Sequence, residues 1–396
     1  MIPARAVVCL GLSQLVGWGV SFYLIGNFGP AMQAELGWTA AGVYGGFSWG
    51  IVCMALASPA AGRAMDRWGG RVVMPAGALL MAAGCALLAV TQSHGLYWTA
   101  WAVLGAGMRL TLYDAAFAAL ARVGGPPARR AMSQITLFGG LSSTVMWPVG
   151  QALAGALGWR GAVAVYALLA LAIIPLYRAL PAGRYDASAD DPGADRPAAD
   201  GSPRLAQALY ALIVMLTSFL TAGNATHLIA MLHGLGLAAQ AAVGVSALWG
   251  IGQVAGRLME LLFGRRVPPI ALNTGTALAL PLCFAVGLAA GQPLPAALYA
   301  FGYGACNGLL TITRGTLPLV LFDHRVYGAL VGRLLVPGLL LTAAAPLAYA
   351  QVIERWGAAA AMLLSLGAAC AVLAASAWLA LRFGRDGATR MRRGPP

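Results

Sequence analysis

Twelve stretches of this chain, each long enough to cross a membrane and nearly free of charge, constrain its fold more than any other feature. A helix needs about 20 mostly apolar residues to cross the hydrocarbon core of a bilayer. Transmembrane β-strands would instead be about ten residues long and would alternate in polarity. The sequence therefore predicts an all-α integral membrane protein of twelve transmembrane helices. The stretches lie at 6–28, 39–61, 71–91, 97–119, 133–156, 162–180, 206–229, 238–262, 270–290, 294–319, 327–349 and 358–382.

The charged residues fix the expected orientation. Only 9% of residues are charged and 60% are apolar, whereas a soluble domain carries about 25% charged residues. The net charge of +13 would suggest a nucleic-acid partner in a soluble protein, but every basic residue here is Arg. The amino terminus and the connections that follow even-numbered stretches hold 19 of the 25 Args, and the opposite connections hold only Arg160 and Arg355. By the positive-inside rule both termini are cytoplasmic. We expect a multi-pass protein of a prokaryotic inner membrane that contacts lipid and binds no nucleic acid.

The chain divides at a polar segment, PAGRYDASADDPGADRPAADGSPR at 181–204, which carries five of the twelve acidic residues. Its composition is typical of a flexible linker. We predict one six-helix bundle over 1–180 and a second over 205–396, which ends in a basic cytoplasmic tail. Short matches at nearly constant offset suggest that the bundles are pseudo-symmetric. Trp49-Gly50-Ile51 recurs at 249–251, and Gly105-Ala106 recurs at 304–305.

A loop motif between the second and third stretches reads Gly62-Arg-Ala-Met-Asp66-Arg67-Trp-Gly69-Gly70-Arg71. It resembles the G-x-x-x-D-R-x-G-R/K signature of the major facilitator superfamily, and it lies at the loop where that family carries it. The resemblance implies a secondary transporter that binds its substrate between two bundles and works by alternating access. Asp66 is expected to face the positive amino terminus of a helix from the other half. The predicted gating motif is Gly62, Asp66, Arg67, Gly69 and Arg71.

A finer resemblance is to the monocarboxylate and oxalate/formate porters. It depends on Arg129-Arg130 before Gly139-Gly140, on Gly158-Trp159-Arg160-Gly161, and on an Arg late in the eighth stretch. In those porters the Arg, which would be Arg257 here, contacts the carboxylate, and an Asp four residues earlier handles the proton. This chain has Gln253 at that earlier position, and it lacks the lysine that those porters carry in the first stretch.

Six charged residues lie inside the predicted helices, where each costs roughly 2.5 to 3.5 kcal/mol on insertion scales. Four are Args and two are acids, which favours an anionic substrate. On a continuous helix Arg109 and Asp114 would lie about 140° apart and could not pair. Ion pairs that close a cytoplasmic gate are an equally weighted alternative to substrate contact. The predicted substrate contacts are Tyr23, Arg109, Asn224, His227, Gln253, Arg257, Asn307 and Arg314, and the predicted proton-coupling residues are Asp114 and Glu260.

The predicted function is uptake of a small organic anion, such as a monocarboxylate, together with protons. No metal motif, nucleophile elbow or Walker sequence occurs, so we expect neither an enzyme nor an ATP-driven pump, and no cofactor. The six cysteines have no metal-like spacing. We expect a monomer. Two alternatives stay open: efflux of drug-like or toxic compounds by proton antiport, and a transporter-like sensor that binds without translocating.

Overall fold

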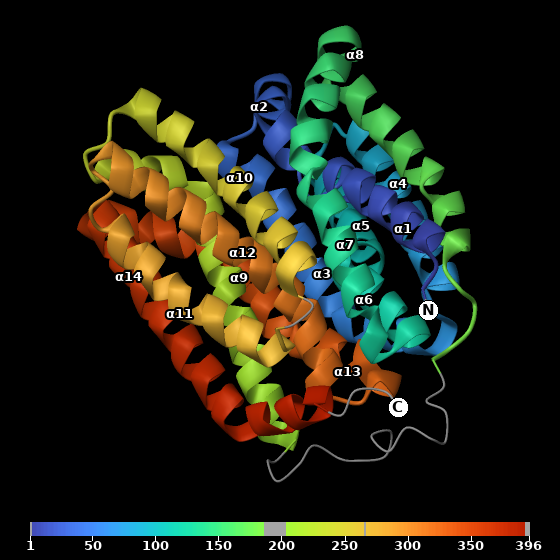
Figure 1. Ribbon diagram of the computed structural model, residues 1–396. Helices are drawn as coiled ribbons and strands as arrows, with labels where there is room; N and C mark the ends of the chain where they lie inside the picture. The colour runs from blue at the N-terminus through green and yellow to red at the C-terminus, as the bar shows by residue number, and fades with distance from the viewer. Residues whose placement is uncertain (1, 186–202, 265–266, 393–396) are drawn as a thin grey trace. The chain divides into compact units, whose positions relative to one another are not determined.

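The computed structural model describes residues 2–185, 203–264 and 267–392, and the part that it describes contains helices and no strand (Figure 1). Most of the predicted linker therefore lies outside the described residues. The α-helices, in chain order, are α1 (Ala4–Val20), α2 (Leu24–Leu36), α3 (Ala40–Trp68), α4 (Gly70–Ala89), α5 (His94–Thr111), α6 (Tyr113–Gly124), α7 (Arg129–Gly140), α8 (Ser142–Ala172), α9 (Pro203–Gly234), α10 (Ala239–Phe263), α11 (Pro269–Gly287), α12 (Pro293–Leu321), α13 (Tyr327–Leu334) and α14 (Val336–Arg392). Short 3-10 helices are η1 (Pro126–Ala128), η2 (Ile174–Ala179) and η4 (His324–Val326).

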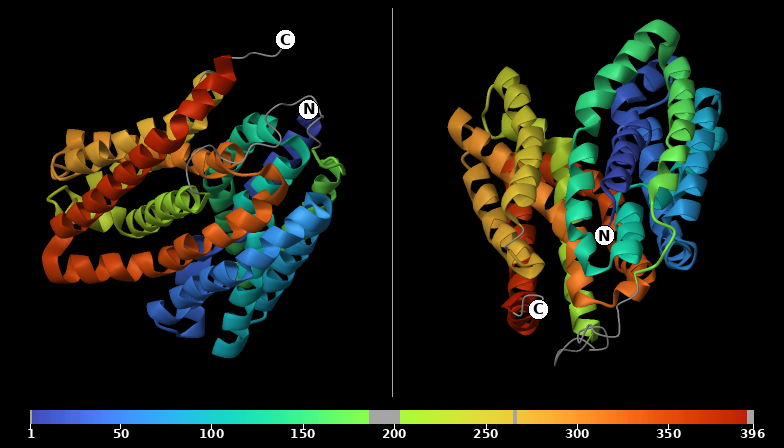
Figure 2. Two further views of the ribbon diagram at one scale, coloured as in Figure 1. Left: turned by 90° about the horizontal axis from the view of Figure 1, so that it is seen from below. Right: turned by 45° about the vertical axis from the view of Figure 1, so that its right-hand side comes forward.

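Eight helical segments among the described residues are long and apolar enough to cross a membrane. Two of them, at 126–179 and 324–384, reverse direction at a glycine, Gly158 in α8 and Gly357 in α14 (Figure 2). The φ values of +70° and +82° at these glycines are strained for residues with a Cβ atom. Each of these two segments therefore contains two of the predicted spans. Helices α10 and α12, which are less apolar, lie at the eighth and tenth predicted spans. All twelve predicted spans are therefore helical.

Several spans are interrupted rather than continuous. The first is broken at Ser21, between α1 and α2, and the fourth is broken at Leu112, between α5 and α6. Leu112 is extended, with φ −74° and ψ −172°. Arg109 and Asp114 consequently lie on different helices, so the angle of about 140° between them, worked out for a continuous helix, was wrong. An extended residue between two helices resets the direction in which every later side chain points.

Packing divides the chain into two compact units. Unit 1 comprises Met1–Tyr185 and Asp323–Val336, and unit 2 comprises Asp186–Phe322 and Pro337–Pro396. Helix α13 therefore belongs with the amino-terminal helices, although it comes from the second half of the sequence. It packs beside α3 (Figure 1). The predicted domain boundaries at 180 and 205 remain a prediction.

The contact between α3 and α13 depends on small residues. A Cβ atom at Gly62 would overlap the carbonyl oxygen of Gly328, and one at Gly332 would lie 2.7 Å from the carbonyl oxygen of Ser58. Small residues spaced four apart on both helices thus bring the two backbones together, as is common where lipid supplies no hydrophobic drive between helices. Any larger side chain at these positions would separate α13 from α3.

Candidate functional site

The loop motif holds the amino end of α13. Asp66 Oδ1 accepts a hydrogen bond from the backbone N–H of Gly328 at 2.9 Å, and Oδ2 accepts one from Ala329 at 2.6 Å. The first N–H groups of a helix have no acceptor within the helix, and the helix dipole favours negative charge there. The expected contact of Asp66 with a helix amino terminus is therefore present. Its role in gating stays a prediction.

A second set of contacts holds the carboxyl end of α13. Ser58 Oγ donates to the carbonyl oxygen of Gly332 at 2.6 Å, and Arg109 Nε donates to Ser58 Oγ at 2.8 Å. Arg109 is only 3% exposed. Positive charge is favoured at a helix carboxyl terminus, so the polarity of these partners matches both ends of α13. Arg109 was predicted to contact substrate. In the structure it supports α13 through its hydrogen bond to Ser58, and contact of Arg109 with substrate stays a prediction.

The rest of the loop motif forms the turn between α3 and α4. Gly69 has φ +75°, a conformation that residues with a Cβ atom rarely adopt, and it ends α3 and precedes α4. The Arg67 guanidinium lies 5.5 Å from the centre of the Trp68 ring, within cation–π range. Arg71 is exposed in the first turn of α4. The motif thus builds a tight turn that carries positive charge.

The break at Leu112 lies beside an aromatic cluster in unit 1. The ring centres of Trp18 and Tyr113 lie 4.9 Å apart, and those of Trp18 and Tyr23 lie 6.1 Å apart. The Trp18 indole N–H is buried and has no hydrogen-bond acceptor among the described residues. Asp114, 9% exposed, lies in the first turn of α6, where the helix dipole favours a carboxylate. Trp18 is not among the predicted substrate contacts, and its buried N–H adds it to the candidates for ligand contact.

Arg257 is the most distinctive polar group of unit 2. It lies in α10 and is 5% exposed. Its Nη2 donates to Gln253 Oε1 at 3.3 Å, while Nε and Nη1 are buried without a hydrogen-bond partner in the described chain. Leaving a buried donor unsatisfied costs about 1–3 kcal/mol, and more when the group is charged. Arg257 therefore presents two unused donors, and an anion could satisfy one of them. Glu260, which is 6% exposed, lies three residues later on the same helix and has an interaction partner.

Three other predicted contacts in unit 2 are occupied by hydrogen bonds within that unit. Asn224 is 1% exposed, accepts from the Tyr299 hydroxyl at 2.6 Å and donates to the Leu220 carbonyl at 2.9 Å. His227 Nε2 lies 2.8 Å from the carbonyl oxygen of Pro346, which can only accept, so this nitrogen carries the proton. Asn307 Nδ2 donates to Thr221 Oγ1 at 3.0 Å. These hydrogen bonds position the three side chains. Contact of these side chains with substrate stays a prediction.

Unit 2 also contains two buried aromatic donors that sequence reasoning did not select. The Tyr303 hydroxyl and the Trp249 indole N–H have no hydrogen-bond partner within the described residues. Their rings are nearly parallel, at 3°, with centres 6.1 Å apart. Tyr303 shares the helix face that includes Asn307 and Arg314, and that polar stripe was the signal available from the sequence. The Arg314 backbone carbonyl accepts from the Tyr210 hydroxyl at 2.7 Å, so part of this residue supports the contact of α12 with α9.

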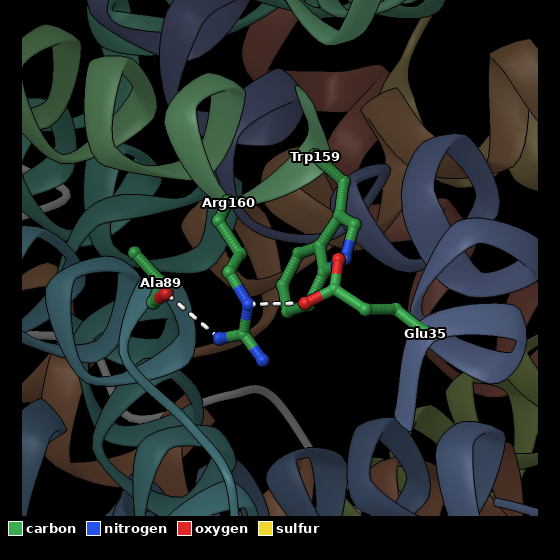
Figure 3. A network of polar contacts seen from close by, with 4 residues as sticks. All are labelled: Glu35, Ala89, Trp159 and Arg160. Atoms are coloured by element: carbon green, nitrogen blue, oxygen red, sulfur yellow. Dashed lines mark hydrogen bonds and ion pairs between the residues drawn. The ribbon is translucent and has the colours of Figure 1, made fainter. Parts of the chain in front are cut away.

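A separate polar network joins α2, α4 and α8 of unit 1 (Figure 3). Glu35 accepts from Arg160 Nε at 2.6 Å and from Trp159 Nε1 at 2.5 Å, and Arg160 Nη1 donates to the Ala89 carbonyl at 2.9 Å. The Glu35 and Arg160 side chains are 49% and 29% exposed. Such a solvated ion pair contributes little to stability, so we interpret the network as a link between helix ends. No group of three or more metal-ligating side chains occurs in the described part of the chain.

Comparison with known proteins identifies the family. The family described as Major Facilitator Superfamily matches residues 10–333, whereas no curated protein sequence matches the chain. Solved structures of transporters share its fold, and three of them are compared with it. The human organic anion transporter MFSD10 (TETRAN) has a TM-score of 0.70 at 19% identity and covers 94% of this chain and 100% of its own.

The other two solved structures are also transporters. The proton:xylose symporter XylE, bound to 6-bromo-6-deoxy-D-glucose, has a TM-score of 0.73 at 12% identity, with coverage of 93% of this chain and 94% of its own. The transporter FucP, in its outward conformation, has a TM-score of 0.66 at 16% identity, with coverage of 93% and 97%. At these identities the likeness shows the fold. The family match covers more than half of the chain, and the chain belongs to the Major Facilitator Superfamily, as a multi-pass membrane transporter and not an enzyme.

Proposed function

We propose that the chain transports a small organic anion, such as a monocarboxylate, together with protons by alternating access. The observation that carries this proposal is the state of Arg257. Its guanidinium is buried, and two of its nitrogens, Nε and Nη1, have no acceptor in the described residues. A carboxylate can accept a charge-assisted hydrogen bond from either nitrogen, which is stronger than a hydrogen bond between neutral groups.

The residue beside Arg257 supports an anionic ligand over a neutral one. Gln253 accepts from Nη2 at 3.3 Å but carries no charge, so it does not itself compensate the positive charge of the guanidinium. The anion would supply that compensation. An acid at this position would have neutralised Arg257 locally and would have favoured neutral ligands.

Proton coupling is assigned to Asp114, with Glu260 as the alternative. Asp114 and Glu260 are the two acids within the predicted spans, and both are at least nine-tenths buried. Asp114→Asn should abolish accumulation driven by a pH gradient and retain substrate exchange, because exchange requires no net proton movement. Accumulation that survives in Asp114→Asn would assign the proton site elsewhere, and Glu260→Gln would be the next variant.

Ligand affinity in detergent tests the assignment of Arg257, because gating rates do not enter an equilibrium measurement. A panel of short-chain carboxylates would be titrated against the wild type, Arg257→Lys and Arg257→Gln. Lys keeps the charge and loses the planar fork, so it should bind weakly, and Gln should not bind. The matched control is Arg355→Gln, which removes an exposed Arg from the same unit. Wild-type affinity in both Arg257 variants would mean that Arg257 has no part in binding.

The fold alone does not choose the substrate class. One structure with this fold belongs to an organic anion transporter and another to a proton:xylose symporter. The case for an anion rests on Arg257 and on the excess of Arg over acid inside the predicted spans, 4 to 2. Counterflow of a labelled carboxylate in proteoliposomes distinguishes a carrier from a sensor, because a sensor would bind the compound without exchanging it across the membrane.

A further inference from the structure

A cavity of about 300 Å³ lies in unit 1, and none of the residues predicted to bind substrate or to couple protons lines it. Residues 68–72 of the turn between α3 and α4 form one wall, Arg122 and Val123 of α6 form another, and residues 181–183 after η2 complete the lining. Its volume is at the lower end of the range for small-molecule sites. The arginine distribution predicts that this loop faces the cytoplasm.

Arg122 brings unused hydrogen-bond donors to this cavity. Its Nε and Nη1 atoms are buried and have no partner among the described residues. Its Nη2 donates only to the Arg67 carbonyl, at 3.5 Å, which is long for a hydrogen bond. Buried charged donors of this kind are costly unless an acceptor satisfies them. The arrangement is therefore incomplete without an anion.

The glycines of the turn leave room beside the guanidinium. A Cβ atom at Gly69 would lie only 3.2 Å from Arg122 Nε, which is closer than an ordinary van der Waals contact. The backbone of the turn thus approaches the guanidinium as closely as a glycine permits. The Gly69 N–H already donates to the Met65 carbonyl at 2.9 Å, which leaves the N–H groups of Gly70 and Arg71 for an anion in the cavity.

Two further features add positive potential to the cavity. The 20-residue helix α4 begins at Gly70, and no side chain caps its first turn. Its amino terminus therefore offers N–H groups and the positive end of a helix dipole. Arg71 lines the cavity from the same turn. Asp66 acts on Arg122 through space, but both of its carboxylate oxygens already accept from the amides of α13.

We propose that this cavity, the Arg122 pocket, binds a phosphate group, carried by an anionic lipid headgroup or by a soluble phosphate monoester. A phosphate presents several acceptor oxygens, which suit an unused Arg122 donor, the Arg71 side chain and the amides of α4 together. The apolar side chains Trp68 and Val72 beside it are 56% and 59% exposed. Exposed Trp is typical of the headgroup level of a bilayer, where lipid phosphates lie.

The test uses the purified full chain and two probes. Isothermal titration with inorganic phosphate in detergent measures soluble binding, and native mass spectrometry with phosphatidylglycerol or phosphatidylcholine measures lipid retention. Arg122→Gln should weaken the interaction on the order of tenfold to a hundredfold, because it removes charge-assisted hydrogen bonds. The exposed Arg71→Gln should weaken it too, without a risk to folding. Arg63→Gln, an exposed Arg outside the pocket, is the matched control and should bind as the wild type does.

The probes separate the two sources of the phosphate. If the wild type binds inorganic phosphate and Arg122→Gln does not, the result supports a soluble phosphate monoester as the ligand. Retention of phosphatidylglycerol over phosphatidylcholine, lost in the same variant, supports a lipid headgroup. The proposal is overturned if the wild type binds neither probe, or if Arg122→Gln and Arg71→Gln bind as tightly as Arg63→Gln. Neither outcome depends on whether Arg257 binds a carboxylate.

Discussion

Replacing Asp66 with Asn should release the amino end of α13 from α3. The carboxylate accepts two short hydrogen bonds, from Gly328 at 2.9 Å and from Ala329 at 2.6 Å. A hydrogen bond to a charged group contributes about 1.5–3 kcal/mol, and a neutral one about 0.5–1.5 kcal/mol. Asn keeps one acceptor oxygen and turns an N–H donor toward the other amide. One charge-assisted bond is lost and the other becomes neutral, so docking should weaken by about 2–4 kcal/mol.

Hydrogen–deuterium exchange at the amides of Gly328 and Ala329 measures this loss directly. Because about 1.4 kcal/mol corresponds to a tenfold change, protection should fall by about thirtyfold to a thousandfold. Asp323→Asn is a matched control, since Asp323 Oδ1 accepts from Arg325 N–H at 2.8 Å and caps η4 just before α13. Asn caps helices as well as Asp does, so this variant should leave protection of α13 almost unchanged.

Two results would refute the reasoning about Asp66. Wild-type protection of α13 in Asp66→Asn would mean that the paired hydrogen bonds do not hold the helix. An equal loss of protection in Asp323→Asn would mean that any change of charge near α13 has the same effect, so that the geometry of Asp66 would not matter.

Further substitutions in unit 1 have expected effects of different size. Gly62→Ala should destabilise unit 1 by about 1–3 kcal/mol, because its Cβ would overlap the backbone of α13. Gly95→Ala should not, because that Cβ would have no neighbour within 4 Å, and thermal unfolding compares the two variants. Ser58→Ala should destabilise unit 1 by about 1–3 kcal/mol, since it removes an acceptor from the buried Arg109 guanidinium. Unchanged hydrogen–deuterium exchange at the carboxyl end of α13 would contradict this. Glu35→Gln should lower stability by less than about 1 kcal/mol, because its ion pair with Arg160 is solvated; a larger thermal shift would show that this pair is structurally essential.

The positions of the helices could be predicted from the sequence because the bilayer sets a minimum apolar length, and that length is visible in the composition. The breaks within the spans could not. Leu112 is an ordinary helix-forming residue, and its extended conformation follows from packing in three dimensions. The sequence therefore placed Arg109 and Asp114 on one helix, where the structure has two.

The candidate site was predictable where a motif encodes a contact and not where the contact depends on tertiary structure. The loop signature predicted that Asp66 faces a helix amino terminus, because the residue type and its place in the motif specify the partner. Nothing in the sequence around Ser58 indicates that its hydroxyl links Arg109 to α13, since these residues are up to 274 positions apart. The pocket at Arg122 was missed for the same reason, because three separated segments build it.

Accumulation of a labelled short-chain carboxylate by the purified protein in vesicles, under an imposed pH gradient, tests the central claim most directly. The account predicts accumulation when the outside is acidic, retention of exchange in Asp114→Asn and no transport in Arg257→Gln. Exchange must also be lost in Arg257→Gln, because that variant should not bind the anion. Accumulation only under the opposite gradient would show antiport instead. Transport of a cation in place of the carboxylate, or wild-type carboxylate transport by Arg257→Gln, would contradict the assignment of the substrate as an anion held by Arg257.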